Sequence, residues 1–151
     1  MELLLPEWAP NIHPLVIHFP IALWIVALIF DLLGIIRPNN WIRNSTVALY
    51  TLAVMSVVAA VISGRQAIDA VNVPFQGEVT AGNHSDWGHY TLYFFASYVI
   101  IRLFVFWNRW DKKRAVAILL LLLGIIGAGL VAKTADLGGK LVYKYGVGTK
   151  Q

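Results

Sequence analysis

The sequence predicts an all-α integral membrane protein, a bundle of four transmembrane helices that forms a single domain over residues 1–151. Composition is the first observation: 58% of the residues are hydrophobic and only 13% are charged, whereas soluble domains carry about a quarter charged residues. Length is the second. Four mainly apolar stretches, each close to the roughly 20 residues that cross a bilayer, cover residues 14–36, 46–66, 87–107 and 115–135. Short connections between them favour a compact bundle.

The first stretch begins with two prolines. Pro14 suits a first helical turn, where the N–H group that proline lacks would have no partner. Pro20 lies deeper, and its ring displaces the carbonyl group of Val16. We therefore expect this helix to kink one turn after it begins, which would open space beside His18.

The other three stretches differ in composition. The second, 46–66, is a nearly uninterrupted apolar run, and the third, 87–107, is rich in aromatic residues and contains Arg102. The fourth, 115–135, consists mostly of Leu, Ile, Ala, Val and Gly. After it, the glycines and the alternating valine and tyrosine residues of GGKLVYKYGVGTK, residues 138–150, predict a short extended C-terminal tail.

The basic residues predict the orientation in the membrane. The connections 37–45 and 108–114 hold six of them: Arg37, Arg43, Arg109, Lys112, Lys113 and Arg114. The middle connection, 67–86, has no lysine or arginine. Because basic loops stay in the cytoplasm, we expect a multi-pass protein with both termini outside, although lysines near the C-terminus weigh the other way. The excess of basic residues is thereby explained without a nucleic acid as partner.

Polar positions recur at an offset of 71 residues. The pairs related by this offset are His13 and His84, His18 and His89, Asp31 and Arg102, and Arg65 and Asp136. Two helical hairpins related by a pseudo-two-fold axis along the membrane normal would explain the recurrence. A charge inside a bilayer is costly unless it is paired. We therefore expect an ion pair between Asp31 and Arg102, and a corresponding pair between Arg65 and Asp136 nearer the helix ends.

The four histidines are candidate axial ligands of a haem iron. Residues five apart differ by about 140° around a helix, so pairing has to occur between helices. His18 and His89 share one depth, and His13 and His84 share another, as two ligands on opposite sides of one haem would. If one haem b is bound, we expect the deeper pair, His18 and His89, to hold it. Crossed pairing, His13 with His89 and His18 with His84, would hold two haems. Arg65 is expected to neutralise a haem propionate.

Two other interpretations of the histidines stay open at this point. The same four imidazoles could bind copper or zinc, although the sequence has no cysteine and only two methionines, which disfavours copper(I). They could also be interfacial histidines that bond to carbonyl groups and water, in a cofactor-free assembly subunit of a membrane complex. The absence of cysteine excludes iron–sulfur clusters and covalently attached haem.

Three elements of the sequence resemble a known family. They are HPLVIHFPIALW at 13–24, Asp31, and GGKLVYKYGVG at 138–148. The chain resembles, over most of its length, the bacterial four-helix membrane family catalogued as domain of unknown function 2231. Members of that family occur alone or joined to Rieske or c-type cytochrome modules. The resemblance implies a redox setting in a bacterial inner membrane, and it implies no particular ligand.

These observations together favour a small b-type haem-binding subunit. We expect it to transfer electrons between a periplasmic carrier, such as a cytochrome c or a Rieske-type protein, and the quinone pool or a larger respiratory complex. Its partners would be the lipid bilayer, other redox subunits and a quinone. The sequence holds no Ser–His–Asp set, phosphate-binding loop or paired carboxylates at a workable spacing. We therefore favour an electron-transfer subunit over a stand-alone enzyme.

Overall fold

A computed structural model describes residues 11–149, which form helices and turns without a strand. The helices are α1 (His13–Val16), α2 (His18–Ile36), α3 (Asn40–Ala70), α4 (Glu78–Trp107) and α5 (Arg114–Tyr143), and the short 3₁₀ turns are η2 (Phe75–Gly77) and η3 (Trp110–Lys112). Taken by length and composition, four helical segments of 24 to 33 residues are apolar enough to cross a membrane. The predicted all-α architecture of four transmembrane helices is confirmed.

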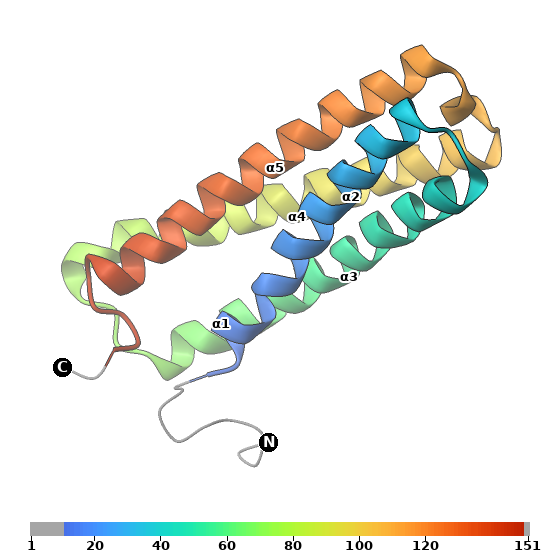
Figure 1. The fold of residues 1–151 in the computed structure, drawn as a ribbon. Helices are drawn as coiled ribbons and strands as arrows, with labels where there is room; N and C mark the ends of the chain where they lie inside the picture. The colour runs from blue at the N-terminus through green and yellow to red at the C-terminus, as the bar shows by residue number, and fades with distance from the viewer. Residues whose placement is uncertain (1–10, 150–151) are drawn as a thin grey trace.

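The helices alternate in direction and form one bundle (Figure 1). α2 packs against α3 and α5, and α4 packs against the same two helices. α2 and α4 therefore lie diagonally across the bundle, as do α3 and α5. This is the arrangement expected of two hairpins, α2–α3 and α4–α5, related by a two-fold axis along the bundle.

Both ends of the chain show how local sequence sets the helix limits. The first helix is interrupted at Ile17, because Pro20 has no N–H group to bond the carbonyl of Val16. The predicted extended tail is wrong for residues 138–143, because α5 continues to Tyr143. After the helix ends, Gly146 adopts a φ of 69°, and the N–H groups of residues 146 and 147 bond the carbonyls of residues 142 and 141, which satisfies carbonyl groups of the last turn.

The middle connection is shorter than the predicted 67–86. α3 reaches Ala70 and α4 already begins at Glu78. Polar residues such as Asn83 and Ser85 therefore lie inside the first turns of α4 and not in a loop. His84 is then a helical residue, with its ring direction fixed by the phase of α4.

The core follows the predicted repeat. Four residues of α2 are buried (Pro20, Trp24, Ala27, Asp31), and the residues 71 positions later in α4 (Thr91, Phe95, Tyr98, Arg102) are buried as well. Trp24 and Phe95 stack across the axis with ring centroids 3.4 Å apart. One stripe of α2 thus faces the equivalent stripe of α4 along the centre of the bundle.

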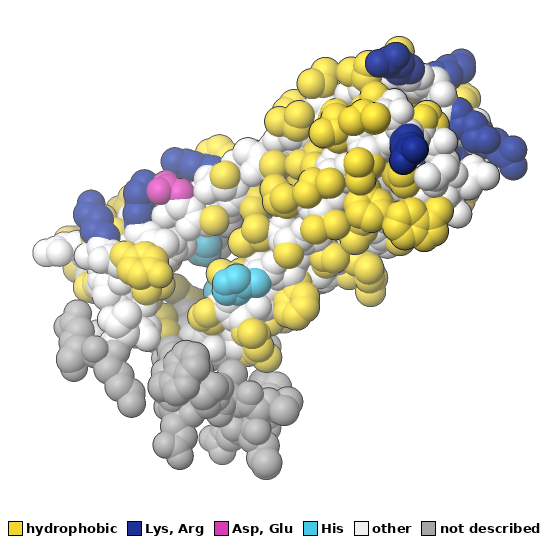
Figure 2. All heavy atoms as spheres, viewed as in Figure 1, with side chains coloured by type: hydrophobic (Ala, Val, Ile, Leu, Met, Phe, Trp, Pro, Cys, Tyr) yellow, Lys and Arg dark blue, Asp and Glu magenta, His cyan; other side chains and the backbone are white. Residues whose placement is uncertain are grey.

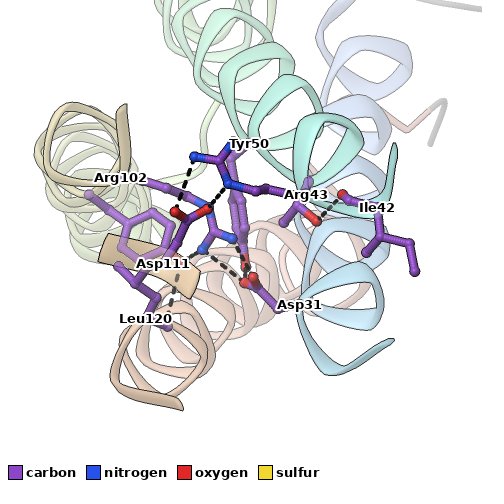
Figure 3. A network of polar contacts seen from close by, with 9 residues as sticks. Asp31, Ile42, Arg43, Tyr50, Arg102, Asp111 and Leu120 are labelled. Carbon is purple, nitrogen blue, oxygen red and sulfur yellow. Dashed lines mark hydrogen bonds and ion pairs between the residues drawn. The ribbon is translucent and has the colours of Figure 1, made fainter. Parts of the chain in front are cut away.

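The predicted ion pair between Asp31 and Arg102 is present and buried (Figure 3). Arg102 donates from both terminal nitrogens to the carboxylate. The Tyr50 hydroxyl donates to the same carboxylate over 2.8 Å, and the Tyr98 hydroxyl accepts from Arg102 over 2.7 Å while donating to the carbonyl of Leu120 over 3.0 Å. The pair therefore ties together all four long helices.

A second ion pair closes the bundle at the end opposite the histidines. Arg43, near the start of α3, donates to Asp111 in the α4–α5 connection and to the carbonyl group of Phe106 (Figure 3). The predicted pair of Arg65 with Asp136 is wrong. Asp136 bonds Lys140, one turn later on its own helix, and Arg65 contacts a histidine.

Candidate histidine site

Two of the four histidines face each other across the bundle axis. The ring centroids of His13, at the start of α1, and His84, in the second turn of α4, are 6.4 Å apart, with an angle of 76° between the ring planes. Both rings are partly buried. They lie at the end of the bundle where α3 leads into α4, which we call the histidine end. The structure thus brings together a symmetric pair at one end of the central stripe.

The hydrogen bonds around His13 occupy its Nδ1 atom and leave its Nε2 atom without a protein partner. Its Nδ1 atom lies 3.0 Å from the hydroxyl oxygen of Ser63, and that hydroxyl donates its only proton to the carbonyl group of Ala60. With that proton directed at Ala60, the Ser63 oxygen accepts from the His13 tautomer that carries its proton on Nδ1. The Nε2 atom of His13 then carries a lone pair, and it has no hydrogen-bond partner among residues 11–149.

His84 reaches the same state by a different route. Its Nδ1 atom donates to the backbone carbonyl of Thr134 over 2.9 Å, and because a carbonyl can only accept, the proton is again on Nδ1. Ser63 and Thr134 are themselves 71 residues apart, so the two histidines are held by equivalent positions of α3 and α5. This is how metal-ligating histidines are oriented, with one nitrogen bonded to the protein and the other left for the metal.

A glycine lets each ring lie against the neighbouring helix. A Cβ atom at Gly64 would come within 3.0 Å of the His13 ring, and one at Gly138 within 2.9 Å of the His84 ring. Both distances are shorter than ordinary van der Waals contact. Any larger residue at either glycine would therefore push its imidazole away from the position that its Nδ1 bond requires.

The other two histidines are not part of this pair. His89 donates from Nδ1 to the carbonyl of Ser85, and its Nε2 atom accepts from the Arg65 guanidinium over 2.9 Å. Both of its nitrogens are thus occupied by the protein. His18 is exposed on the surface of the helix. The expected facing of His18 and His89, and the crossed pairs, do not occur, because both residues lie off the stripe that faces the axis.

The family of the chain follows from a family model that matches residues 9–151 and is described as "Predicted membrane protein (DUF2231)". The chain belongs to the DUF2231 family. Comparison of this DUF2231 protein with curated proteins and with solved structures found no match to either. The family description agrees with the four apolar helices.

The surface of the DUF2231 protein is hollowed at the histidine end. Figure 2 shows this hollow at the histidine end, between the C-terminal part of α5 and the α1–α2 segment, with histidine side chains on both sides. The Ile17 interruption lies in the same part of the chain.

The donor set of the site is two imidazoles. Among residues 11–149 of the DUF2231 protein, no group of three or more His, Asp or Glu side chains is arranged to hold a metal ion. Structural zinc takes four protein ligands and catalytic zinc three, whereas a haem iron needs only two axial ligands from the protein because the macrocycle supplies the rest. The set present fits the haem requirement.

The sequence carried a signal for the facing pair. His13 lies seven residues before Pro20, and the buried residues Trp24, Ala27 and Asp31 follow at spacings of four, three and four. His84 stands in the same relation to the equivalent residues of α4. Residues at that spacing share one face of a helix. Depth alone favours His18 and His89, but helical phase selects His13 and His84.

Proposed function

We propose that this protein is a b-type haem-binding subunit of the bacterial inner membrane, with His13 and His84 as the axial ligands and a role in electron transfer. The observation that carries the proposal is the facing pair of imidazoles whose Nδ1 atoms are both hydrogen-bonded by the protein. Two imidazoles on opposite sides of one metal ion, each with a bond of about 2.0 Å, have ring centroids roughly 6.3 Å apart. The 6.4 Å between these two rings matches that value.

Other residues of the histidine end have roles consistent with this ligand. Ser63 and the Thr134 carbonyl orient the rings and make the imidazoles more basic, which tunes the potential of a bound iron. Arg65 is exposed beside His89, where its guanidinium is available for a propionate carboxylate. When bound, haem b supplies one-electron transfer, and the protein supplies position, burial and charge.

The charge distribution supports an orientation with the histidine end outside. Six basic residues belong to the opposite end, and Figure 2 shows Lys and Arg side chains grouped there. By the positive-inside rule that end is cytoplasmic, so both termini lie outside. Reporter fusions after Lys113 and after Gln151 should give opposite signals, and matching signals would contradict this orientation.

This orientation places the proposed haem near a periplasmic electron donor. We infer a soluble carrier such as a cytochrome c or a Rieske-type protein as donor, and the quinone pool or a larger respiratory complex as acceptor. The facing imidazoles are the part of the structure that supports a redox role. The choice among these partners rests on the family resemblance of HPLVIHFPIALW and GGKLVYKYGVG.

An absorption spectrum of the purified protein tests the proposal. We expect the α-band of protohaem after reduction with dithionite in the unmodified protein. His13→Ala or His84→Ala should each abolish it. His18→Ala, which removes an exposed imidazole five residues after His13, should leave it intact. Loss of the band in all three variants, or no haem in the unmodified protein, would refute the assignment. Metal analysis would then distinguish a copper or zinc site from a cofactor-free assembly subunit.

A further inference from the structure

The last three turns of α5 and Lys144, the residue that follows them, carry a row of charged side chains. Lys133, Asp136, Lys140 and Lys144 follow one another at spacings of three, four and four residues, which places them on one face of the helix. All four are exposed. Figure 2 shows dark-blue and magenta side chains side by side along this part of α5. The row is predominantly basic.

The depth of the row follows from the length of α5. The helix begins at Arg114, and at about 1.5 Å per residue roughly 20 residues cross the hydrocarbon core. The apolar part therefore ends near residue 135, which agrees with the predicted span. Asp136, Lys140 and Lys144 follow in the headgroup layer, and the long side chain of Lys133 can reach the same layer from inside.

These residues surround a shallow concavity. It is lined by Asp136, Gly139, Lys140, Tyr143 and Lys144. Asp136 neutralises one ammonium group through its 2.7 Å bond to Lys140, whereas Lys144 has no ion pair among residues 11–149. Gly139 leaves its side of the concavity open, because an added Cβ atom there would meet nothing within 4 Å. A small anionic group therefore has room and net positive charge.

Aromatic side chains mark the same level. Tyr143 is 92% exposed at the edge of the concavity, and the Lys133 ammonium lies 5.9 Å from the ring centroid of Trp87. Tyrosine and tryptophan are enriched at the boundary between hydrocarbon and headgroups. Lysines held at that boundary attract anionic lipids.

We propose that this concavity is a binding site for the headgroup of an anionic phospholipid, whose phosphate is bound by Lys140 and Lys144. Depth and charge together select this occupant, because the site lies in the layer where lipid phosphates are most concentrated. The Tyr143 ring covers the glycerol region of the lipid. The site is independent of the histidine pair and does not depend on a bound haem.

Lipid retention measured by native mass spectrometry tests the site. The full chain is purified in detergent and mixed with phosphatidylglycerol or phosphatidylcholine at equal concentration. We expect phosphatidylglycerol to be retained in preference. The double variant Lys140→Gln/Lys144→Gln should weaken its retention between about fivefold and 30-fold, the effect of one to two lysines near an anionic surface. Retention of phosphatidylcholine should not change.

The matched control is Lys112→Gln/Lys113→Gln, which removes the same charge at the opposite end. It should retain phosphatidylglycerol as the unmodified protein does. Equal retention of the two lipids by the unmodified protein, or equal losses in the two double variants, would overturn the proposal. So would competition by free inorganic phosphate at the lipid concentration, because that would identify a soluble anion as the ligand. Circular dichroism establishes that both variants remain helical.

Discussion

Asp31→Asn should destabilise the bundle strongly, because it leaves the Arg102 guanidinium buried inside the bundle without a counter-charge. Both side chains are only 8% exposed. The replacement keeps the shape of the side chain and can still accept from Tyr50, so it removes little besides the charge. Breaking a buried ion pair by removing one partner costs about 3–5 kcal/mol.

The surroundings of Arg102 place the expected loss near the lower end of that range. The hydrogen bond to the Tyr98 hydroxyl and the contact with the Tyr50 ring, whose centroid is 4.6 Å from the guanidinium carbon, remain after the substitution. They stabilise the cation in part. The guanidinium Nε atom is already buried without a partner, so the site has no spare acceptor to compensate. We expect a loss of about 3 kcal/mol.

The measurement is unfolding of the purified protein in mixed micelles by titration with SDS, followed by circular dichroism. The control is the exchange Asp31→Arg/Arg102→Asp, which restores opposite charges at the same two buried positions. It should recover at least half of the loss, because the hydroxyls of Tyr50 and Tyr98 can each act as donor or acceptor. A loss below about 1 kcal/mol, or equal damage in the single and exchanged variants, would refute the assigned role of the pair.

Two further predictions use matched variants. Ser63→Ala removes the group that accepts from His13 and should lower haem affinity about 10- to 100-fold in a haem titration, whereas Thr134→Ala keeps the backbone carbonyl that holds His84 and should have no such effect. Gly127→Ala would place a Cβ atom against the Trp24 ring. It should lower the free energy of unfolding in the SDS titration by about 1–3 kcal/mol. Gly129→Ala, where an added Cβ atom meets nothing within 4 Å, should be neutral or slightly stabilising.

Polar positions were the most informative part of the sequence. In a chain with so few charged residues, each intramembrane charge needs a partner, and so the offset of 71 residues predicts the Asp31–Arg102 pair that the structure contains. The same reasoning fails for Arg65 and Asp136 near the helix ends. There, water and neighbouring side chains offer other partners, and Asp136 finds Lys140 one turn away.

Hydropathy located the helices but underestimated their length. A span ends in sequence where apolar residues end, whereas a helix continues as long as its backbone groups are bonded. α4 begins at Glu78 and α5 ends at Tyr143, well beyond the apolar runs on which the spans were drawn. The direction of the histidines could not follow from depth, because depth says nothing about rotation around the helix. The heptad spacing between His13 and the buried residues of α2 does indicate the direction of the His13 side chain around the helix.

The residues of α2 and α4 on the bundle axis follow the 71-residue repeat more closely than the groups of α3 and α5 that bond the histidines. Paired residues of α2 and α4 meet at the centre of the bundle, so a change in one requires a matching change in the other. α3 and α5 hold the two histidines by different groups: the Ser63 hydroxyl of α3 bonds His13, and the Thr134 carbonyl of α5 bonds His84. A hydroxyl that passes its proton to the Ala60 carbonyl is polarised differently from a carbonyl already bonded within a helix. An iron bound between the two imidazoles would therefore have two chemically similar ligands of unequal basicity. The His13 side can then be tuned by side-chain substitution, whereas the His84 side is fixed by the backbone.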